Sequence, residues 1–247
     1  MSRPVIAIPG RFTESASALR YRGLVAARKL LEAVWAAGGD PHVLLPAPGP
    51  DGVDWEARLR GVDGVLLPGG GDVDPRRYGG DSTHVSLYDV DEVQDEVDFT
   101  LAAYALEHGL PTLAVCRGLH VVNALLGGTL VIDMDVNHRH HVHTVDIHDP
   151  DDHLGLGNVP VACSCYHHQA VDRVADGITV LGRAEDGVVE AVSIASTGWA
   201  AGVQWHPEDT YDLDPAQLLP FRRLVAEASA TWIRPSSCRS AASSRRP

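Results

Sequence analysis

The chain has 247 residues, of which 45% are hydrophobic and 21% are charged, and this composition suits one well-buried α/β domain better than two. The formal net charge of -13 argues against nucleic acid and anionic membranes as partners, because both require a basic surface. No apolar run approaches the roughly 18 residues of a membrane span, and the apolar start of the chain is too short for a signal peptide.

In the first half of the chain, short apolar runs alternate with segments of helical spacing. Strands are predicted at residues 5–8, 42–45, 64–67 and 110–115, and helices at residues 20–37, 55–60 and 89–108. Residues 11–17 are predicted to form a polar loop near the carboxyl ends of the strands, which is the edge that carries the site in an open α/β sheet. In the helix over residues 89–108, an apolar stripe is predicted to face the core: Val93, Val97, Leu101 and Leu106.

The strand predicted to end at Val115 is followed at once by Cys116 and a helical pattern. Ala114 and Gly118 flank the cysteine two positions on either side, and a sharp turn requires such small neighbours. A strand-to-helix elbow of this kind is typical of hydrolase nucleophiles, and the N-terminus of the helix favours a thiolate. Taken alone, Cys116 is more simply a buried core residue. The glycine turn at residues 67–72 and the run at residues 202–208 favour the catalytic interpretation.

The glycine turn follows the predicted strand at residues 64–67. Gly69, Gly70 and Gly71 allow positive φ angles and a close approach of the backbone to a ligand. Taken alone, the segment is equally well an ordinary turn. Beside a cysteine elbow, the better interpretation is one half of an oxyanion hole.

In the second half, strands are predicted at residues 127–132, 141–147, 159–165, 178–181, 188–194 and 199–203, and a closing helix at residues 215–230. The last three strands are predicted to be antiparallel. Pro207 is predicted to hold its neighbours His206 and Glu208 in an extended, non-helical segment. The Ser/Arg/Pro-rich residues 234–247 predict a disordered tail, which leaves one domain over residues 1–233.

The chain contains four cysteines, and this number is too small for a disulfide scaffold at this length: Cys116, Cys163, Cys165 and Cys238. Cys163 and Cys165 lie two residues apart on a predicted strand, so their side chains point to the same face at a spacing too wide for an unstrained disulfide. We therefore expect free thiols in a reducing cytoplasm.

Residues 133–153 are unusually rich in histidine and aspartate: Asp133, Asp135, His138, His140, His141, His143, Asp146, His148, Asp149, Asp151, Asp152 and His153. A metal site is one hypothesis for this composition. The alternative, which we favour here, is an edge strand with solvated histidines. On that interpretation we predict no bound metal and no cofactor.

Four segments in this order resemble the class I glutamine amidotransferases: PGGGDVDP at 68–75, CRGL at 116–119, YHHQAV at 166–171 and GVQWHPE at 202–208. Within that fold they are most similar to the γ-glutamyl-γ-aminobutyrate hydrolase family, peptidase C26. The resemblance spans residues 3–232. It implies a flavodoxin-like three-layer sandwich, with helices on both faces of a mostly parallel central sheet and an added antiparallel section.

The resemblance also implies the roles of individual residues. Cys116 would be the nucleophile, His206 its acid–base partner, and Glu208 the carboxylate that orients the imidazole. The backbone N–H groups of Gly70 and Arg117 would form the oxyanion hole. The residues expected to hold the substrate are His120, His167 and Gln169. The substrate would be a small γ-glutamyl amide, cleaved through a thioester to glutamate and an amine.

The chain departs from the family pattern at three positions. Glutamine is usual where His120 stands, and an Asn-Ser pair is usual where Ser164 and Cys165 stand; Ala114 replaces a common glycine and is tolerable. The first two departures lie among residues expected to hold the glutamyl end of the substrate. We therefore predict that hydrolysis is kept while the preferred γ-glutamyl amide differs.

Three functions are compatible with these motifs. The first is a stand-alone γ-glutamyl amide hydrolase. The second is a glutaminase subunit that passes ammonia to a synthetase partner, although no synthetase domain is fused to the motifs. The third is a binding or regulatory module with an inactive site, for which the altered substrate-holding residues argue. A homodimeric assembly stays open.

Overall fold

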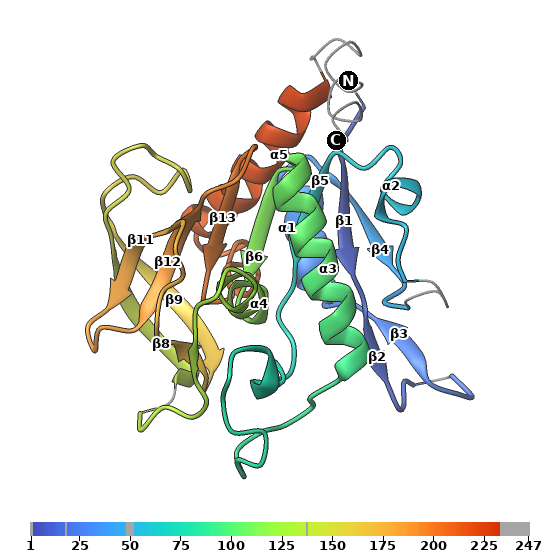
Figure 1. Ribbon diagram of the computed structural model, residues 1–247. Coiled ribbons are helices and arrows are strands. Elements are labelled where there is room, and N and C mark those ends of the chain that lie inside the picture. Colours follow the sequence, from blue (N-terminus) through green and yellow to red (C-terminus); the bar gives the residue numbers. More distant parts are fainter. Residues whose placement is uncertain (1, 18, 48–51, 137, 233–247) are drawn as a thin grey trace, which may run out of the picture.

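The computed structural model describes residues 2–17, 19–47, 52–136 and 138–232. A nine-stranded sheet runs through the molecule in the order β4-β1-β5-β6-β13-β12-β11-β8-β9 (Figure 1). Its strands are β1 (Val5–Pro9), β4 (Asp40–Leu44), β5 (Gly64–Leu67), β6 (Thr112–Val115), β8 (His138–Ile147), β9 (Pro160–His167), β11 (Ile178–Ala184), β12 (Val189–Ile194) and β13 (Ala200–Val203). Two short antiparallel pairs complete the strands: β2 (Arg11–Thr13) with β3 (Gly23–Val25), and β7 (Leu130–Val131) with β10 (Ala170–Val171).

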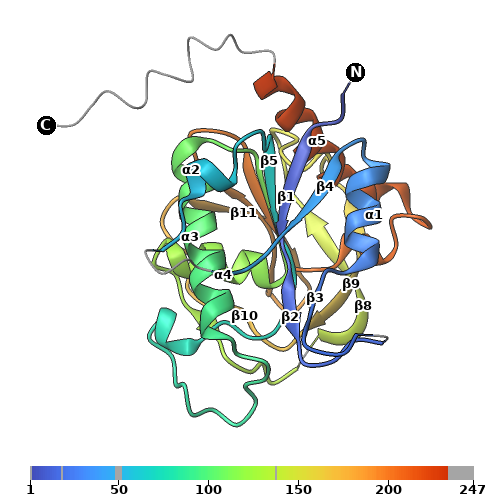
Figure 2. The same ribbon diagram turned by 90° about the vertical axis from the view of Figure 1, so that its right-hand side faces the viewer.

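Helices cover both faces of the sheet, as Figure 2 shows from its edge. They are α1 (Arg28–Ala36), α2 (Trp55–Arg58), α3 (Glu92–His108), α4 (Arg117–Leu125) and α5 (Leu219–Trp232), with 3-10 turns η1 (Pro75–Arg77), η2 (Pro207–Asp209) and η3 (Pro215–Leu218). One apolar core packs α1 and α5 on one face, through residues such as Leu30 and Phe221. The other core packs α2, α3 and α4 on the opposite face, through residues such as Leu101 and Leu119. This is the predicted three-layer α/β architecture.

The sheet has a parallel and an antiparallel section. Pairing is parallel from β4 through β1, β5 and β6 to β13, and antiparallel from β13 outward through β12, β11 and β8 to β9. The central strands β5, β6 and β13 are four residues long and fully buried, as expected where a parallel sheet is covered on both faces, whereas the edge strand β4 is partly exposed. The predicted antiparallel addition is thus present, and β13 joins it to the parallel section.

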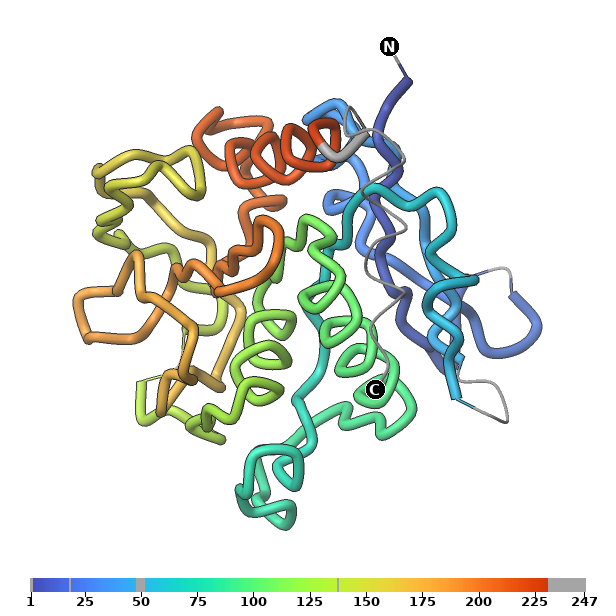
Figure 3. Tube along the Cα trace, turned by 45° about the horizontal axis from the view of Figure 1, so that its top comes forward, coloured from blue at the N-terminus to red at the C-terminus, as the bar shows by residue number. Residues whose placement is uncertain are grey.

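The carboxyl ends of four neighbouring parallel strands lead into the residues singled out above. Arg11 follows β1, the glycine turn follows β5, Cys116 follows β6 and His206 follows β13. Parallel strands end at the same edge of a sheet, and ligands in open α/β folds bind there. The segment between β5 and α3 projects from this edge (Figure 3).

Several predicted boundaries were wrong for identifiable reasons. The helix predicted from residue 20 begins at Arg28, because residues 23–25 form β3 and pair with β2, which also replaces the start of the predicted polar loop. The strand predicted over residues 127–132 is only two residues long, Leu130–Val131, and lies outside the large sheet. Pro207 does not hold an extended segment, since it opens the 3-10 turn η2 that contains Glu208. The predicted tail at 234–247, with Cys238, lies outside the described residues.

Helix α3 buries three residues of the predicted apolar stripe, Val97, Leu101 and Leu106, and the prediction was wrong only at the start of the helix. Val93 is 43% exposed, while Gln94, Asp95 and Asp98 are buried. The helix begins later than predicted because the Asp91 side chain accepts hydrogen bonds from the first free N–H groups, an arrangement that caps a helix. In the described part of the chain, we find no helix with the length and apolar character needed to cross a bilayer.

Candidate active site

Cys116 stands at a strained turn between β6 and α4. Its φ of 51° and ψ of -108° are values that residues other than glycine rarely adopt. The Cys116 N–H donates to the carbonyl of Val203 at 2.8 Å, which ties the turn to the end of β13. At Gly118 a Cβ would lie 2.4 Å from the carbonyl oxygen of Leu67, so α4 can begin against β5 only with glycine there.

His206 and Glu208 follow β13 and are held together by η2. The His206 Nδ1 lies 2.8 Å from the Glu208 Oε1, and Glu208 is 4% exposed. The backbone N–H of His206 donates to the carbonyl of Ser164 at 2.8 Å, so β9 also fixes this segment. Because Nδ1 is engaged by the carboxylate, the Nε2 atom of the ring is left for the side of Cys116.

The imidazole and the sulfur meet above Gly69. A Cβ at Gly69 would lie 2.8 Å from the His206 Cε1 and 3.7 Å from the Cys116 Cβ, so no side chain fits between them. Burial opposes protonation of His206, but the negative charges of Cys116 and then of Glu208 outweigh it, and the pKa of His206 lies well above its ordinary value. The protonated imidazole is therefore favoured, and its free nitrogen can donate toward the Cys116 sulfur.

The two predicted oxyanion donors lie beside the cysteine. Arg117 is the first residue of α4, so its N–H has no carbonyl partner within the helix. Gly70 has no room for a side chain, since a Cβ there would lie 2.8 Å from the Arg11 Nε and 3.1 Å from the Arg117 Cδ. Both residues line the cavity above Cys116.

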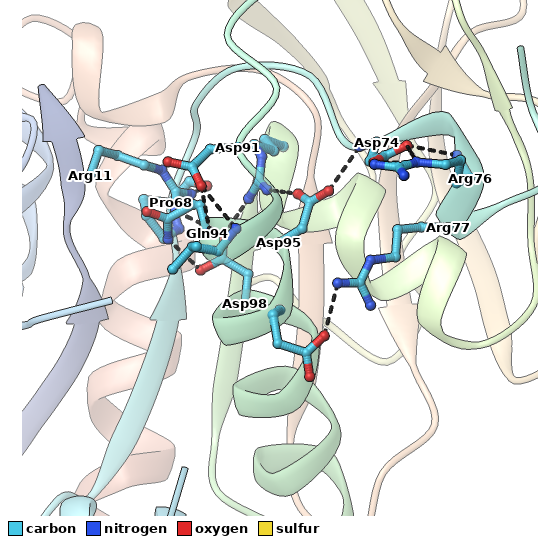
Figure 4. A network of polar contacts seen from close by, with 12 residues as sticks. Arg11, Pro68, Asp74, Arg76, Arg77, Asp91, Gln94, Asp95 and Asp98 are labelled. Carbon is cyan, nitrogen blue, oxygen red and sulfur yellow. Dashed lines mark hydrogen bonds and ion pairs between the residues drawn. The ribbon is translucent and has the colours of Figure 1, made fainter. Parts of the chain in front are cut away.

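Arg11, which was not predicted from the sequence as a site residue, is hydrogen-bonded to the glycine turn (Figure 4). Its guanidinium donates to the carbonyl oxygens of Pro68 at 3.1 Å and Gly69 at 3.2 Å. A third nitrogen donates to the Asp98 carboxylate at 2.8 Å. These bonds hold the Pro68 and Gly69 carbonyls in place and so fix the peptide that presents the Gly70 N–H.

The Arg117 side chain is buried beneath the same turn and pairs with both Asp95 and Asp98. Burial opposes its charge, but Asp98 and Asp95 raise the pKa of Arg117 and keep it protonated. The Asp95 carboxylate also accepts the N–H of Asp74 at 2.9 Å, and Gln94 donates to Asp98 at 2.9 Å. We call Arg11, Gln94, Asp95, Asp98 and Arg117 the arginine–aspartate network; it joins both oxyanion donors to α3.

His120 contacts Cys116 through a neighbouring amide. Its Nε2 lies 2.7 Å from the Gln204 Oε1, and the Gln204 Nε2 donates to the Cys116 sulfur at 3.7 Å. Burial, followed by the charge of His167, lowers the pKa of His120 to about 3, so the ring is neutral and its Nε2–H donates to Gln204. This fixes the orientation of the amide, whose N–H group then faces the sulfur. Gln204 belongs to the GVQWHPE segment but was not predicted to act.

A cavity of about 630 Å³ opens above Cys116. The three residues predicted to hold the substrate all line it: His120, His167 and Gln169. The side-chain amide of Gln169 is buried beside the Tyr78 hydroxyl, so it can reach a ligand only after a small rearrangement. His168, not predicted, also lines the cavity and bridges Asp72 at 3.0 Å and Asp133 at 2.9 Å.

Cys165 does not lie where the departure from the family pattern predicted. It is fully buried and is absent from the cavity lining, whereas the neighbouring Tyr166 and His167 line the cavity. Its sulfur faces Glu190 and His143 on the far side of β9. Cys116, Cys163 and Cys165, the cysteines of the described chain, are free thiols.

A cysteine at a strand-to-helix elbow, an imidazole and a carboxylate from the next strand, and a glycine turn at the same sheet edge define the class I glutamine amidotransferase fold. The family model described as Peptidase C26 matches residues 4–208, so the chain belongs to that family. The predicted family is thereby confirmed, and membership puts the chain among hydrolases of the glutamine amidotransferase-like fold.

Two relatives illustrate the range of names in this group. A Mycobacterium tuberculosis protein, provisionally assigned as a glutamine amidotransferase, is 34% identical over 215 residues; the match covers 80% of this chain and 66% of that protein, somewhat less than two thirds of its length. The gamma-glutamyl-gamma-aminobutyrate hydrolase of Escherichia coli O157:H7 is 32% identical over 199 residues, which cover 73% of this chain and 77% of the relative.

Among solved structures, a glutamine amidotransferase from Thermotoga maritima superposes with a TM-score of 0.60. It is 14% identical, and the match covers 94% of this chain and 98% of that protein. This similarity confirms the predicted fold class.

Proposed function

We propose that the protein hydrolyses γ-glutamyl amide bonds through a covalent thioester on Cys116 and releases glutamate and an amine. The observation that carries this proposal is the buried His206–Glu208 pair beside a cysteine on a strained elbow. Family membership and a relative named as a γ-glutamyl amide hydrolase support the substrate class.

In the first step, the Cys116 thiolate attacks the γ-carbonyl carbon and a C–S bond forms. The negative charge that develops on the carbonyl oxygen is stabilised by the N–H groups of Gly70 and Arg117; loss of one such donor costs roughly 10²–10³ in rate. The C–N bond then breaks, and the proton held on the His206 imidazolium passes to the departing amine.

In the second step, the neutral His206 accepts a proton from water, and the hydroxide attacks the thioester carbonyl. The C–S bond breaks, glutamate leaves and the thiolate is restored. Glu208 stabilises the imidazolium and fixes its tautomer throughout. Gln204 donates to the sulfur and keeps it oriented toward the cavity.

Specificity for the glutamyl end is assigned to His120, His167 and Gln169, and the amine half would occupy the remainder of the cavity. His120 replaces the glutamine usual in the family, and being neutral it presents one donor and one acceptor. We therefore expect a preferred amide other than γ-glutamyl-γ-aminobutyrate.

The test is turnover of a panel of γ-glutamyl amides, including γ-glutamyl-γ-aminobutyrate and glutamine, by wild type, Cys116→Ser and Cys163→Ser. Cys163 is equally buried but lies outside the cavity, so it controls for the loss of a thiol. We expect wild type and Cys163→Ser to turn over at least one amide, and a diazo-ketone analogue of glutamine to label Cys116. Absence of both turnover and label would refute the hydrolase; γ-glutamyl-γ-aminobutyrate as by far the best substrate would refute only the altered specificity.

The second candidate function is a glutaminase subunit for a synthetase partner. The relative named as a glutamine amidotransferase favours it. It predicts glutaminase activity that appears only when a copurifying partner is added, with the same label on Cys116.

A further inference from the structure

A second buried cluster of chemically reactive side chains lies behind the cavity. It consists of His138 on β8, Cys165 and His167 on β9, and Glu190 on β12, and we call it the histidine–cysteine cluster. Each residue is at most 4% exposed, and one ligand atom from each lies within 4.8 Å of all the others. None of these contacts takes part in the hydrolysis proposed above.

A β-bulge brings the histidine of β8 into this cluster. His140 has a φ of 54° and interrupts the register between Arg139 and His141. One extra residue in a strand reverses the alternation of side chains beyond it. His138 therefore shares a face with His143, although the two are separated by an odd number of positions. Solvated histidines, the interpretation favoured from the sequence, describe His140 and His141 but not His138.

The two cluster histidines each direct one ring nitrogen at the same carboxylate. The Nδ1 atom of His167 lies 2.9 Å from the carbonyl of Gln169, which can only accept, so the proton is on Nδ1. Its Nε2 is buried, has no hydrogen-bond partner, and lies 3.4 Å from the Glu190 Oε1. The Nε2 of His167 therefore faces a carboxylate oxygen at a distance that a cation between them would suit.

His138 repeats this arrangement. Its Nε2 lies 2.9 Å from the Asp186 carboxylate, which accepts the ring proton, and its Nδ1 lies 3.3 Å from the same Glu190 oxygen. Metal-bound histidines commonly donate their other ring N–H to a carboxylate or a backbone carbonyl in this way. In both histidines one ring nitrogen faces the centre of the cluster, and the other is hydrogen-bonded outside it, to Asp186 or to the Gln169 carbonyl. This is the arrangement found around a bound cation.

The spacing of the inner atoms agrees with a tetrahedral ion. Bonds of about 2.0–2.1 Å to nitrogen or oxygen and about 2.3 Å to sulfur put tetrahedral ligand atoms roughly 3.3–3.6 Å apart. The two imidazole nitrogens lie 3.3 and 3.4 Å from the Glu190 Oε1, which is longer than an ordinary hydrogen bond and close to the separation of two ligands. The Cys165 sulfur lies 3.8 Å from the other oxygen, Oε2, and all four ligand atoms lie within 4.8 Å of one another, so binding requires only a small inward movement.

We infer that His138, Cys165, His167 and Glu190 bind one Zn²⁺ ion, which cross-links β8, β9 and β12 behind the candidate active site. Two imidazoles, one thiolate and one carboxylate form a ligand set that zinc accepts. All four ligands come from the protein and all are buried, so the site is structural and carries no open position for catalysis. Zinc would also fix the His167 ring at the wall of the cavity.

The test is metal analysis of protein purified without a histidine tag, for wild type and four variants. We expect about one zinc per wild-type chain, and an affinity at least hundredfold lower in His138→Asn and Cys165→Ser. His140→Asn and Cys163→Ser are matched controls from the same two strands and should bind as wild type. Cobalt substituted for zinc should give a thiolate charge-transfer band in wild type and Cys163→Ser that Cys165→Ser lacks.

Chelation supplies a readout that needs no variant to fold. Removing the metal from wild type should lower the Tm by about 10 °C, because a bound ion stabilises the folded state in proportion to its occupancy. Zinc that binds no tighter than micromolar, or that binds equally well to His138→Asn and Cys165→Ser, overturns the proposal. Neither result depends on hydrolytic activity, so failure of the zinc site is distinct from failure of the proposed function.

Discussion

Two buried polar clusters lie near Cys116, and they differ in how their charges are matched. In the arginine–aspartate network, Arg11 and Arg117 face Asp95 and Asp98, so two cations meet two anions. In the histidine–cysteine cluster, the rings of His138 and His167 and the Cys165 thiol surround the single carboxylate of Glu190, which the ring of His143 also approaches. The first cluster is complete as it stands, whereas the second is completed by a cation.

The difference indicates different tasks. The arginine–aspartate network bonds to the peptides of the glycine turn and to the first residue of α4, so it acts on the position of the oxyanion donors. The histidine–cysteine cluster joins strands of the antiparallel section, so it acts on the stability of the wall behind them. Perturbing the first cluster should lower both the rate and the stability, whereas perturbing the second should lower the stability alone.

The largest effect is expected from Glu208→Gln. Glu208 is a buried acid outside both clusters, and its charge is matched by one partner, His206. The amide keeps the shape but favours the wrong imidazole tautomer, so kcat on the best γ-glutamyl amide should fall by about 10³–10⁴-fold with little change in KM. Steady-state kinetics measure this. A fall of less than tenfold would mean that Glu208 does not orient His206.

Asp98→Asn tests the arginine–aspartate network. The amide leaves Arg11 and Arg117 short of one buried negative charge, so the free energy of unfolding should fall by about 3–5 kcal/mol. The oxyanion donors should also shift, and kcat/KM should fall by roughly 10–100-fold. Urea unfolding and kinetics check the two effects.

The matched control for Asp98→Asn is Glu96→Gln on the same helix. Glu96 is half exposed and pairs with Arg77 at the surface, at 2.9 Å. Its loss should cost less than about 1 kcal/mol and leave kcat/KM unchanged. If Asp98→Asn and Glu96→Gln changed the free energy of unfolding and kcat/KM equally, the arginine–aspartate network would have no special role in positioning the oxyanion donors.

His120→Gln tests a smaller, pH-dependent effect. The pKa of His120 is about 3 in the folded protein, while its ordinary value is 6.5, so the unfolded chain binds a proton that the folded chain refuses. Stability is therefore lost as the pH falls below 6.5, and by pH 5 this loss amounts to about 2 kcal/mol. Glutamine at position 120 does not titrate, so the variant should lack this part of the loss of stability at low pH. Urea unfolding at pH 7 and pH 5 measures it, and an equal loss in both proteins would contradict the assignment.

The smallest expected effect is that of chelation on catalysis. At a temperature where the metal-free protein stays folded, kcat/KM should remain within about threefold of the zinc-bound value, because a structural ion does not touch the reacting atoms. A loss of 100-fold or more would make the histidine–cysteine cluster part of the catalytic apparatus and end the distinction between the two clusters.

Much of the candidate site could be predicted because its residues lie in short contiguous motifs. Cys116, His206 and Glu208 each follow the end of a strand, and parallel strands end at one edge, so local patterns and topology together bring them close. The fold class was predictable for the same reason, since alternating strands and helices leave few ways to cover a parallel sheet.

The arginine–aspartate network could not be predicted in the same way. Arg11 and Asp98 are 87 positions apart, and no local pattern joins them. A signal existed in α3, where Gln94 and Asp98 fall on the same face as the buried Leu101 and Ala105. Charged residues beside a core-facing apolar stripe indicate a buried partner, but the pattern does not tell which residue that partner is.

The histidine–cysteine cluster depended on a feature that the sequence did not reveal. Simple alternation puts His138 and His143 on opposite faces, and only the bulge at His140 reverses this. Histidine-rich composition suggested the right segment, but not which of its members are buried.

Strand β13 has parallel β6 on one side and antiparallel β12 on the other. It is therefore the boundary between the parallel and antiparallel sections of the sheet, and His206 and Glu208 lie in the segment that follows it. Loops beyond β12 can thus be exchanged or lengthened to suit new amines, provided that β9 keeps the Ser164 carbonyl that holds the His206 N–H. Chimaeras with foreign outer loops would therefore alter substrate choice and leave the rate of thioester formation nearly constant.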